Sequence, residues 1–116
     1  MAELSLKTVL TYSKNNASVA RSISSQFGVS ASPLSQGVQN IPTTDATLDL
    51  NAIGTIGYVY VRNLDATNYI IIGSDGSAYP LKLKAGEWAV FRWNAAAIHV
   101  KANTAACDVE YSAFSD

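Results

Sequence analysis

Apolar and polar residues alternate with a period of two along most of the chain, which would place successive side chains on opposite faces of a strand. Helical periodicity is nearly absent. Short clusters rich in Gly, Asn and Asp interrupt the alternation at intervals of roughly ten residues, and these residue types are typical of tight turns. A parallel α/β sheet would instead need long helical crossovers. The pattern predicts an all-β fold, an antiparallel β-sandwich with jelly-roll connectivity favoured and eight to ten strands.

A single domain is predicted over residues 1–116, because a chain of this length holds about one domain with its own core. Small polar residues around Pro33 and Gly37 predict a loop or an irregular edge. The wider segment 17–46 is predicted to form an irregular arm or edge of the domain. The first two predicted strands form a hairpin closed by the turn "SKNNAS". The clearest strands are predicted over residues 58–63, 68–73, 78–84, 88–93, 97–102 and 107–114.

The turn from Asp65 to Asn68 is predicted to close a hairpin with the arms "YVYVRN" and "NYIIIG". The second arm is apolar on both faces, as is the segment "EWAVFRW". A strand with two apolar faces suits a position with one face on the core and the other on a second protein surface. The same residues would also suit the core or its rim. The candidate interface residues are Tyr58, Tyr60, Tyr69, Ile71, Trp88 and Trp93.

Cys107 and His99 are the only thiol and the only imidazole, so a nucleophilic dyad has to be considered. They lie on either side of the turn "KANTAA". If this turn closes a hairpin, the register that pairs apolar residues sets Val100 opposite Cys107 and His99 opposite Asp108. Cys107 then points into the core while His99 points outward. The register therefore predicts a buried structural cysteine and a histidine at the rim.

No other residues have the spacing of a catalytic, cofactor or metal site. One cysteine and one histidine cannot form a zinc site without carboxylates, no phosphate-binding loop is present, and the acidic residues are scattered over turns and outward positions. The sequence therefore predicts a protein that is not an enzyme, with no metal and no cofactor. With a single cysteine, no disulfide can form within the chain.

The charge balance predicts which partners the protein lacks. Lys and Arg number 8 against 9 Asp and Glu, and this balance gives no field that would attract nucleic acid or an anionic membrane. The first residues have neither the basic start nor the continuous apolar stretch of a signal peptide. No apolar run approaches the roughly 18 residues that a membrane span needs. We expect a soluble protein with a neutral surface that suits contacts with other proteins.

Three segments, "GYVYVRNLDATNYIIIG", "YPLKLKAGEWAVFRWN" and "AIHVKANTAACDVEYSAFSD", closely resemble parts of a group of small tailed-bacteriophage virion structural proteins. The resemblance covers roughly the C-terminal half of the chain, and "SKNNASVARSIS" is similar to the opening hairpin of that group. It implies a capsid cement or decoration protein that binds the major capsid protein on the capsid exterior as a homotrimer, after assembly in the host cytoplasm. It brings no catalytic residues.

Carbohydrate binding is the alternative function that the residues leave open. Aromatic side chains on a sheet beside basic residues can stack on sugar rings. Trp88, Trp93 or the tyrosines would then serve a virion tail or fibre module that binds carbohydrate on the host surface. The same aromatic residues would also suit a core or a subunit interface.

Overall fold

The computed structural model describes residues 3–29, 34–50 and 53–116 of the chain. The chain divides into two compact units, Met1–Ser30 and Ala31–Asp116. The regular elements of the described residues are all β-strands, and each pairing between them is antiparallel. The predicted all-β, antiparallel fold is confirmed.

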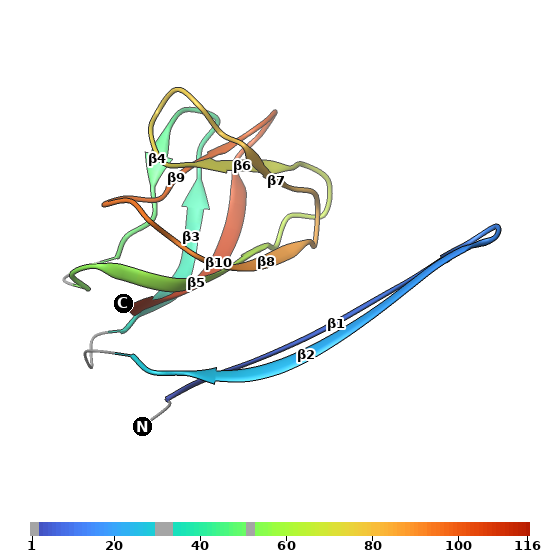
Figure 1. The fold of residues 1–116 in the computed structure, drawn as a ribbon. Coiled ribbons are helices and arrows are strands. Elements are labelled where there is room, and N and C mark those ends of the chain that lie inside the picture. Colours follow the sequence, from blue (N-terminus) through green and yellow to red (C-terminus); the bar gives the residue numbers. More distant parts are fainter. Residues whose placement is uncertain (1–2, 30–33, 51–52) are drawn as a thin grey trace. The chain divides into compact units, whose positions relative to one another are not determined.

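The first unit is a hairpin of two long strands, β1 (Leu4–Lys14) and β2 (Ala17–Phe27) (Figure 1). Its register runs from the pair Leu4 and Phe27 to the pair Lys14 and Ala17 at the tip. Asn15 in the turn has a φ of 55°. Asn tolerates this left-handed conformation because its short polar side chain can bond the local backbone. The hairpin predicted from the alternation on either side of "SKNNAS" is confirmed.

The second unit contains two four-stranded sheets (Figure 1). Sheet I has the order β3 (Leu34–Ile41), β10 (Cys107–Ser115), β5 (Ile56–Asn63), β8 (Trp88–Arg92). Sheet II has the order β4 (Ala46–Thr47), β9 (His99–Ala102), β6 (Ile70–Gly73), β7 (Leu81–Leu83).

The segment predicted to be a loop or irregular edge, around Pro33 and Gly37, is partly within these elements. Residues 30–33, which include Pro33, lie outside the described residues. Gly37 belongs to β3, an edge strand of sheet I. The wider segment 17–46 includes β2 and β3, and β4 begins at its last residue.

Every connection from β3 to β10 passes from one sheet to the other, apart from the link between β6 and β7. The predicted hairpin with arms "YVYVRN" and "NYIIIG" is therefore wrong, because β5 lies in sheet I and β6 in sheet II. The turn itself is present: an oxygen of the Asp65 carboxylate accepts bonds from the backbone N–H groups of Thr67 and Asn68, at 3.0 and 2.6 Å. It is a corner between sheets, and the amide of Asn63 holds it by donating to the carbonyls of Asn68 and Leu83.

The C-terminal hairpin is also corrected. β9 pairs with β4 and β6, whereas β10 pairs with β3 and β5, so Cys107 lies opposite Ile41 and not opposite Val100. His99 does not face Asp108. The inward direction of Cys107 is nevertheless confirmed, because its side chain is fully buried. Alternation correctly predicted that Cys107 points inward, but it carries no information about which strand lies alongside.

The core lies between the two sheets, and both contribute to it through their inner faces. Its members are fully or almost fully buried and are mostly Ile and Val. They are Ile41, Leu48, Ile53, Ile56, Val59, Val61, Ile70, Ile72, Leu83, Ile98, Val100, Ala102, Cys107, Val109, Tyr111 and Ala113. The pattern confirms that the second unit is held together by apolar burial.

Candidate interaction surfaces

One face of the hairpin collects all of its large apolar side chains except Val9. Residues that pair directly across an antiparallel ladder share a face, and the register pairs Leu4 with Phe27 and Tyr12 with Val19. The opposite face carries mainly Ser. We call this set the apolar ribbon face, and its members are Leu4, Leu6, Leu10, Tyr12, Val19, Ile23 and Phe27.

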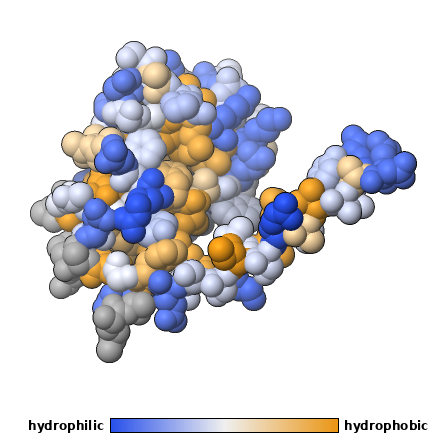
Figure 2. Space-filling view, in the orientation of Figure 1, coloured by the Kyte–Doolittle hydropathy of each residue, from blue (hydrophilic) through white to orange (hydrophobic). Residues whose placement is uncertain are grey.

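Much of the apolar ribbon face is open to solvent. Ile23 is 67% exposed and Leu10 55% exposed, which is unusual for side chains of this size on one face. Figure 2 shows hydrophobic residues along the hairpin and hydrophilic residues at its tip. The described part of Met1–Ser30 has no third strand or helix to cover this face. Since a two-stranded hairpin is at best marginally stable in water, the face requires a partner surface.

A second apolar surface is the outer face of sheet I. Side chains on one side of this sheet fill the core, and those on the other side point outward. The outward set includes Tyr58, Tyr60 and Trp88, as well as Val38 and Val90. Trp88 is 64% exposed and Val38 60% exposed. Three of the predicted interface residues therefore lie together on one face.

Polar contacts fix several groups on the outer face of sheet I. The Tyr60 hydroxyl donates to Oε1 of Glu110 at 2.7 Å, and burial together with this bond raises the pKa of Tyr60. The Arg92 guanidinium lies 4.5 Å from the centre of the Tyr58 ring. Arg62 lies over Trp88 at 5.9 Å. The face combines aromatic rings with arginines, and both residue types are enriched in protein–protein interfaces.

Tyr69 and Ile71 lie on the outer face of sheet II, away from the three residues on sheet I. The Lys82 ammonium is 4.1 Å from the centre of the Tyr69 ring. In the ladder, Ile71 is paired with Lys82 on one side and Lys101 on the other. This face is basic, whereas on the outer face of sheet I Arg62 lies opposite Glu110 and Arg92 pairs with Asp116. The six predicted interface residues thus do not form one surface.

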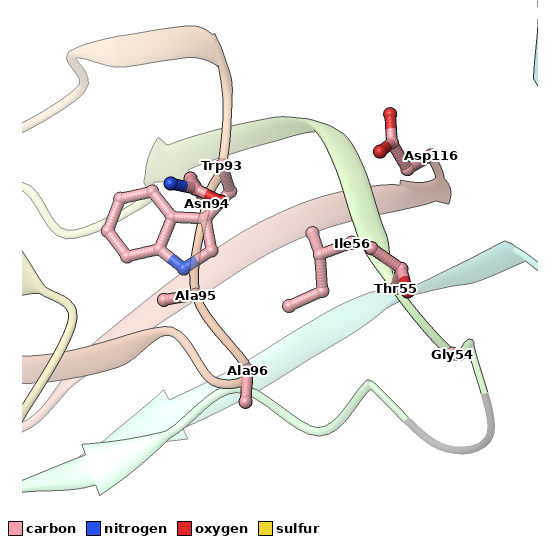
Figure 3. A pocket seen from close by; sticks show the side chains of 8 residues that line it. All are labelled: Gly54, Thr55, Ile56, Trp93, Asn94, Ala95, Ala96 and Asp116. Carbon is pink, nitrogen blue, oxygen red and sulfur yellow. The ribbon is translucent and has the colours of Figure 1, made fainter.

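Trp93 is packed against the core instead of standing free on a sheet. Its ring centre is 5.3 Å from that of Phe91, and its Nε1–H donates to the carbonyl of Ala97 at 2.9 Å. Beside it is a surface pocket of about 300 Å³ (Figure 3). The residues that line the pocket are Gly54, Thr55, Ile56, Trp93, Asn94, Ala95, Ala96 and Asp116.

A polar cluster that the sequence did not reveal joins Asp45, Tyr79 and His99. The Tyr79 hydroxyl donates to the Asp45 carboxylate, and Nδ1 of His99 lies 3.0 Å from Asp45 Oδ2. The bonds from Tyr79 and His99 lower the pKa of Asp45, while the bond to Asp45 raises the pKa of Tyr79 to about 12. The residues are far apart in the chain and have no shared motif. Their contacts tie the segment before β4 to β9 and to the loop after β6.

Cys107 and His99 are not brought together as a pair. Cys107 lies in the core, where burial raises the pKa of its thiol, and the ring nitrogen of His99 contacts Asp45. In the described ranges, no group of three or more His, Cys, Asp or Glu residues could hold a metal ion. The same ranges contain no helix that is long and apolar enough to cross a membrane.

No protein family, curated protein or solved structure matches the chain. The resemblance to bacteriophage structural proteins therefore stays a prediction from the sequence segments.

Proposed function

We propose that the protein is a structural component of a bacteriophage virion, a cement or decoration protein that binds the major capsid protein on the outer capsid surface as a homotrimer. One observation carries the proposal. Each unit of the chain has an apolar surface with much of its area exposed, the apolar ribbon face in the first unit and the outer face of sheet I in the second. A protein with two such surfaces can contact two protein neighbours, as a subunit of a shell must.

These surfaces are in excess of what folding needs. The inner faces of both sheets already supply a closed core of mostly Ile and Val side chains. Tyr60 and Trp88 point to the other side of sheet I, where they add nothing to that core. Large aromatic residues are enriched in interfaces because they bury area while keeping a polar end. A role in assembly accounts for their position.

The strand orders support the jelly-roll interpretation. β10 lies between β3 and β5 in sheet I, and β9 lies between β4 and β6 in sheet II, an arrangement that two interleaved Greek keys produce. Jelly rolls serve both as capsid domains and as lectin domains. The fold is therefore compatible with the cement role and with its alternative, and the site has to decide between them.

Uptake by capsids tests the proposal. Shells stripped of the protein and incubated with the purified chain should take it back to saturation and become more resistant to heat. A reconstruction of the refilled particle should show the protein on the capsid exterior. Failure of stripped shells to bind the protein, at concentrations where it self-associates, would overturn the cement role.

The alternative is a tail or fibre module that binds host carbohydrate, and one residue favours it. Trp88 is exposed with Arg62 over its ring, so it could offer a stacking surface to a sugar. Trp93, packed against the core, could not do so in the same way. Binding of the chain to host cells or glycans, abolished in Trp88→Ala, would support this alternative, and absence of any glycan binding would remove it.

A further inference from the structure

We propose that the apolar ribbon face of one copy packs on the outer face of sheet I of a second copy, so that each copy donates its hairpin and receives another. The proposal rests on the self-association included in the proposed function, but it does not depend on capsid binding. Both surfaces keep exposed side chains such as Ile23 and Val38. One contact of this kind would cover both of them.

Charge argues against the simplest alternative, in which two hairpins stack on each other. Arg21 is paired with Leu10 on the apolar ribbon face, and Lys14 lies on the same face at the tip. The one carboxylate in the described part of the first unit is Glu3, which precedes β1 and accepts the backbone N–H of Val29 at 3.0 Å. Two stacked hairpins would therefore bring like charges together with no carboxylate between them.

Charge also selects sheet I over sheet II as the receiving surface. Residues 1–30 carry an excess of two positive charges, whereas residues 31–116 carry an excess of three negative charges. On the outer face of sheet I, Arg62 lies opposite Glu110 in the ladder and Arg92 forms an ion pair with Asp116, so carboxylates balance the cations of this face. The outer face of sheet II instead presents Lys82 and Lys101. Complementary charge orients association, so a basic hairpin should prefer sheet I.

The size of the ribbon argues for a closed ring and against an open pair. Each strand has 11 residues. With a rise of about 3.3 Å per residue and a spacing of about 4.8 Å between strands, one face of the two-stranded hairpin covers on the order of 350 Å². A single contact would bury less per partner than the roughly 800 Å² of a standard stable interface. In a ring each copy makes two contacts, one as donor and one as acceptor, and its buried area approaches that size. The proposed homotrimer is one such ring.

Two surface variants of the full chain separate the donor from the acceptor. Ile23→Asp places a charge on the apolar ribbon face. Val38→Arg places a charge on the outer face of sheet I, opposite Glu110, where it repels a basic hairpin without burying an unpaired group. Matched controls are Ser24→Asp on the polar face of the hairpin and Thr47→Arg on sheet II. Circular dichroism checks that each variant keeps the wild-type β spectrum.

Sedimentation of each variant and a mixing experiment with both variants then test the proposed contact between copies. We expect the wild type and both controls to sediment as trimers, and Ile23→Asp and Val38→Arg each to sediment as monomers. In a mixture of the two variants only one kind of contact can form and no ring can close, so tagged Val38→Arg should retain untagged Ile23→Asp on a column only at concentrations well above those at which the wild type is a trimer. Neither variant should retain untagged copies of itself.

Three results would overturn the proposal. A monomeric wild type would show that no copies associate, and an oligomeric Val38→Arg or an oligomeric Ile23→Asp would show that the contact joins like surfaces. If either variant loses its β spectrum, Leu10→Asp and Val90→Arg repeat the test at other positions on the same two faces. Since no capsid is present in these measurements, their failure is distinct from a failure of the virion role.

Discussion

Cys107 lies in the core between the two sheets, and burial raises the pKa of its thiol. The protonated thiol is a poor nucleophile, so the native protein should resist a polar alkylating reagent. We expect Cys107→Ser to lower the free energy of unfolding by about 1 to 3 kcal/mol, because a buried hydroxyl loses more hydration than a thiol. Urea unfolding of the two proteins measures this difference.

Ser112→Ala on the outer face of sheet I is a control for the cysteine substitution, and its unfolding midpoint should remain close to that of the wild type. Full stability of Cys107→Ser together with rapid alkylation of the native thiol would contradict the buried position.

The hydrogen bonds of Asp45 predict that the stability of the fold depends on pH. Its hydrogen bonds from Tyr79 and His99 hold its pKa below the ordinary value. A carboxyl with a lowered pKa stabilises the folded state above its unfolded pKa of about 3.9, and this contribution is lost as the pH falls through the folded pKa. Asp45→Asn should therefore lower the urea midpoint at neutral pH, and the difference from the wild type should close in acid. A difference that persists unchanged at low pH would assign the effect to packing instead of charge.

At the scale of single elements, the turn between β6 and β7 depends on Gly73. A Cβ at this position would collide with the carbonyl oxygen of Ala78. The backbone there cannot easily move, because the Asp75 carboxylate accepts bonds from the N–H groups of Ser77 and Ala78 at 2.8 and 2.9 Å. We expect Gly73→Ala to destabilise the fold by about 3 kcal/mol, whereas Ser74→Ala should have little effect. Thermal unfolding of both variants provides the comparison.

The elements also show how far sequence reasoning reaches. Alternation predicted the all-β class, the first hairpin and the inward direction of Cys107, because burial depends on which face a side chain occupies. It did not predict that β5 and β6 lie in different sheets. Turn residues such as Asp65 specify that the chain reverses, but the sheet that receives the next strand depends on pairing with distant segments.

The candidate surfaces were predicted only in part for the same reason. An apolar residue on the second face of a strand is visible in the sequence, and Tyr58, Tyr60 and Trp88 do share one face. Tyr69 and Ile71 belong to the other sheet, so the strand order separates them from that group. The contacts of Asp45 span 34 residues to Tyr79 and 54 residues to His99, and no local pattern marks them.

At the scale of the whole molecule, salt distinguishes apolar burial from ion pairing. The proposed contact buries mainly uncharged side chains, and the few charges serve to orient it. Exposed ion pairs are weak and are screened at ordinary ionic strength. We expect the proposed trimer to remain largely intact at roughly 0.5 M salt, as apolar association does. Sedimentation equilibrium at low and high salt measures this, and dissociation into monomers would assign the contact to charge.

The position of β10 at the centre of sheet I has a consequence for the order of events after synthesis or dilution from denaturant. β10 pairs with β3, and Leu34 and Phe114 meet across 80 residues of chain. Such distant pairings form slowly, whereas a hairpin with a short turn can form within about 1 to 10 μs. The proposed donor hairpin, only marginally stable by itself, can then form and re-form long before the proposed acceptor sheet exists. Recovery of trimers should therefore be limited by a first-order step, with a rate that does not rise with protein concentration.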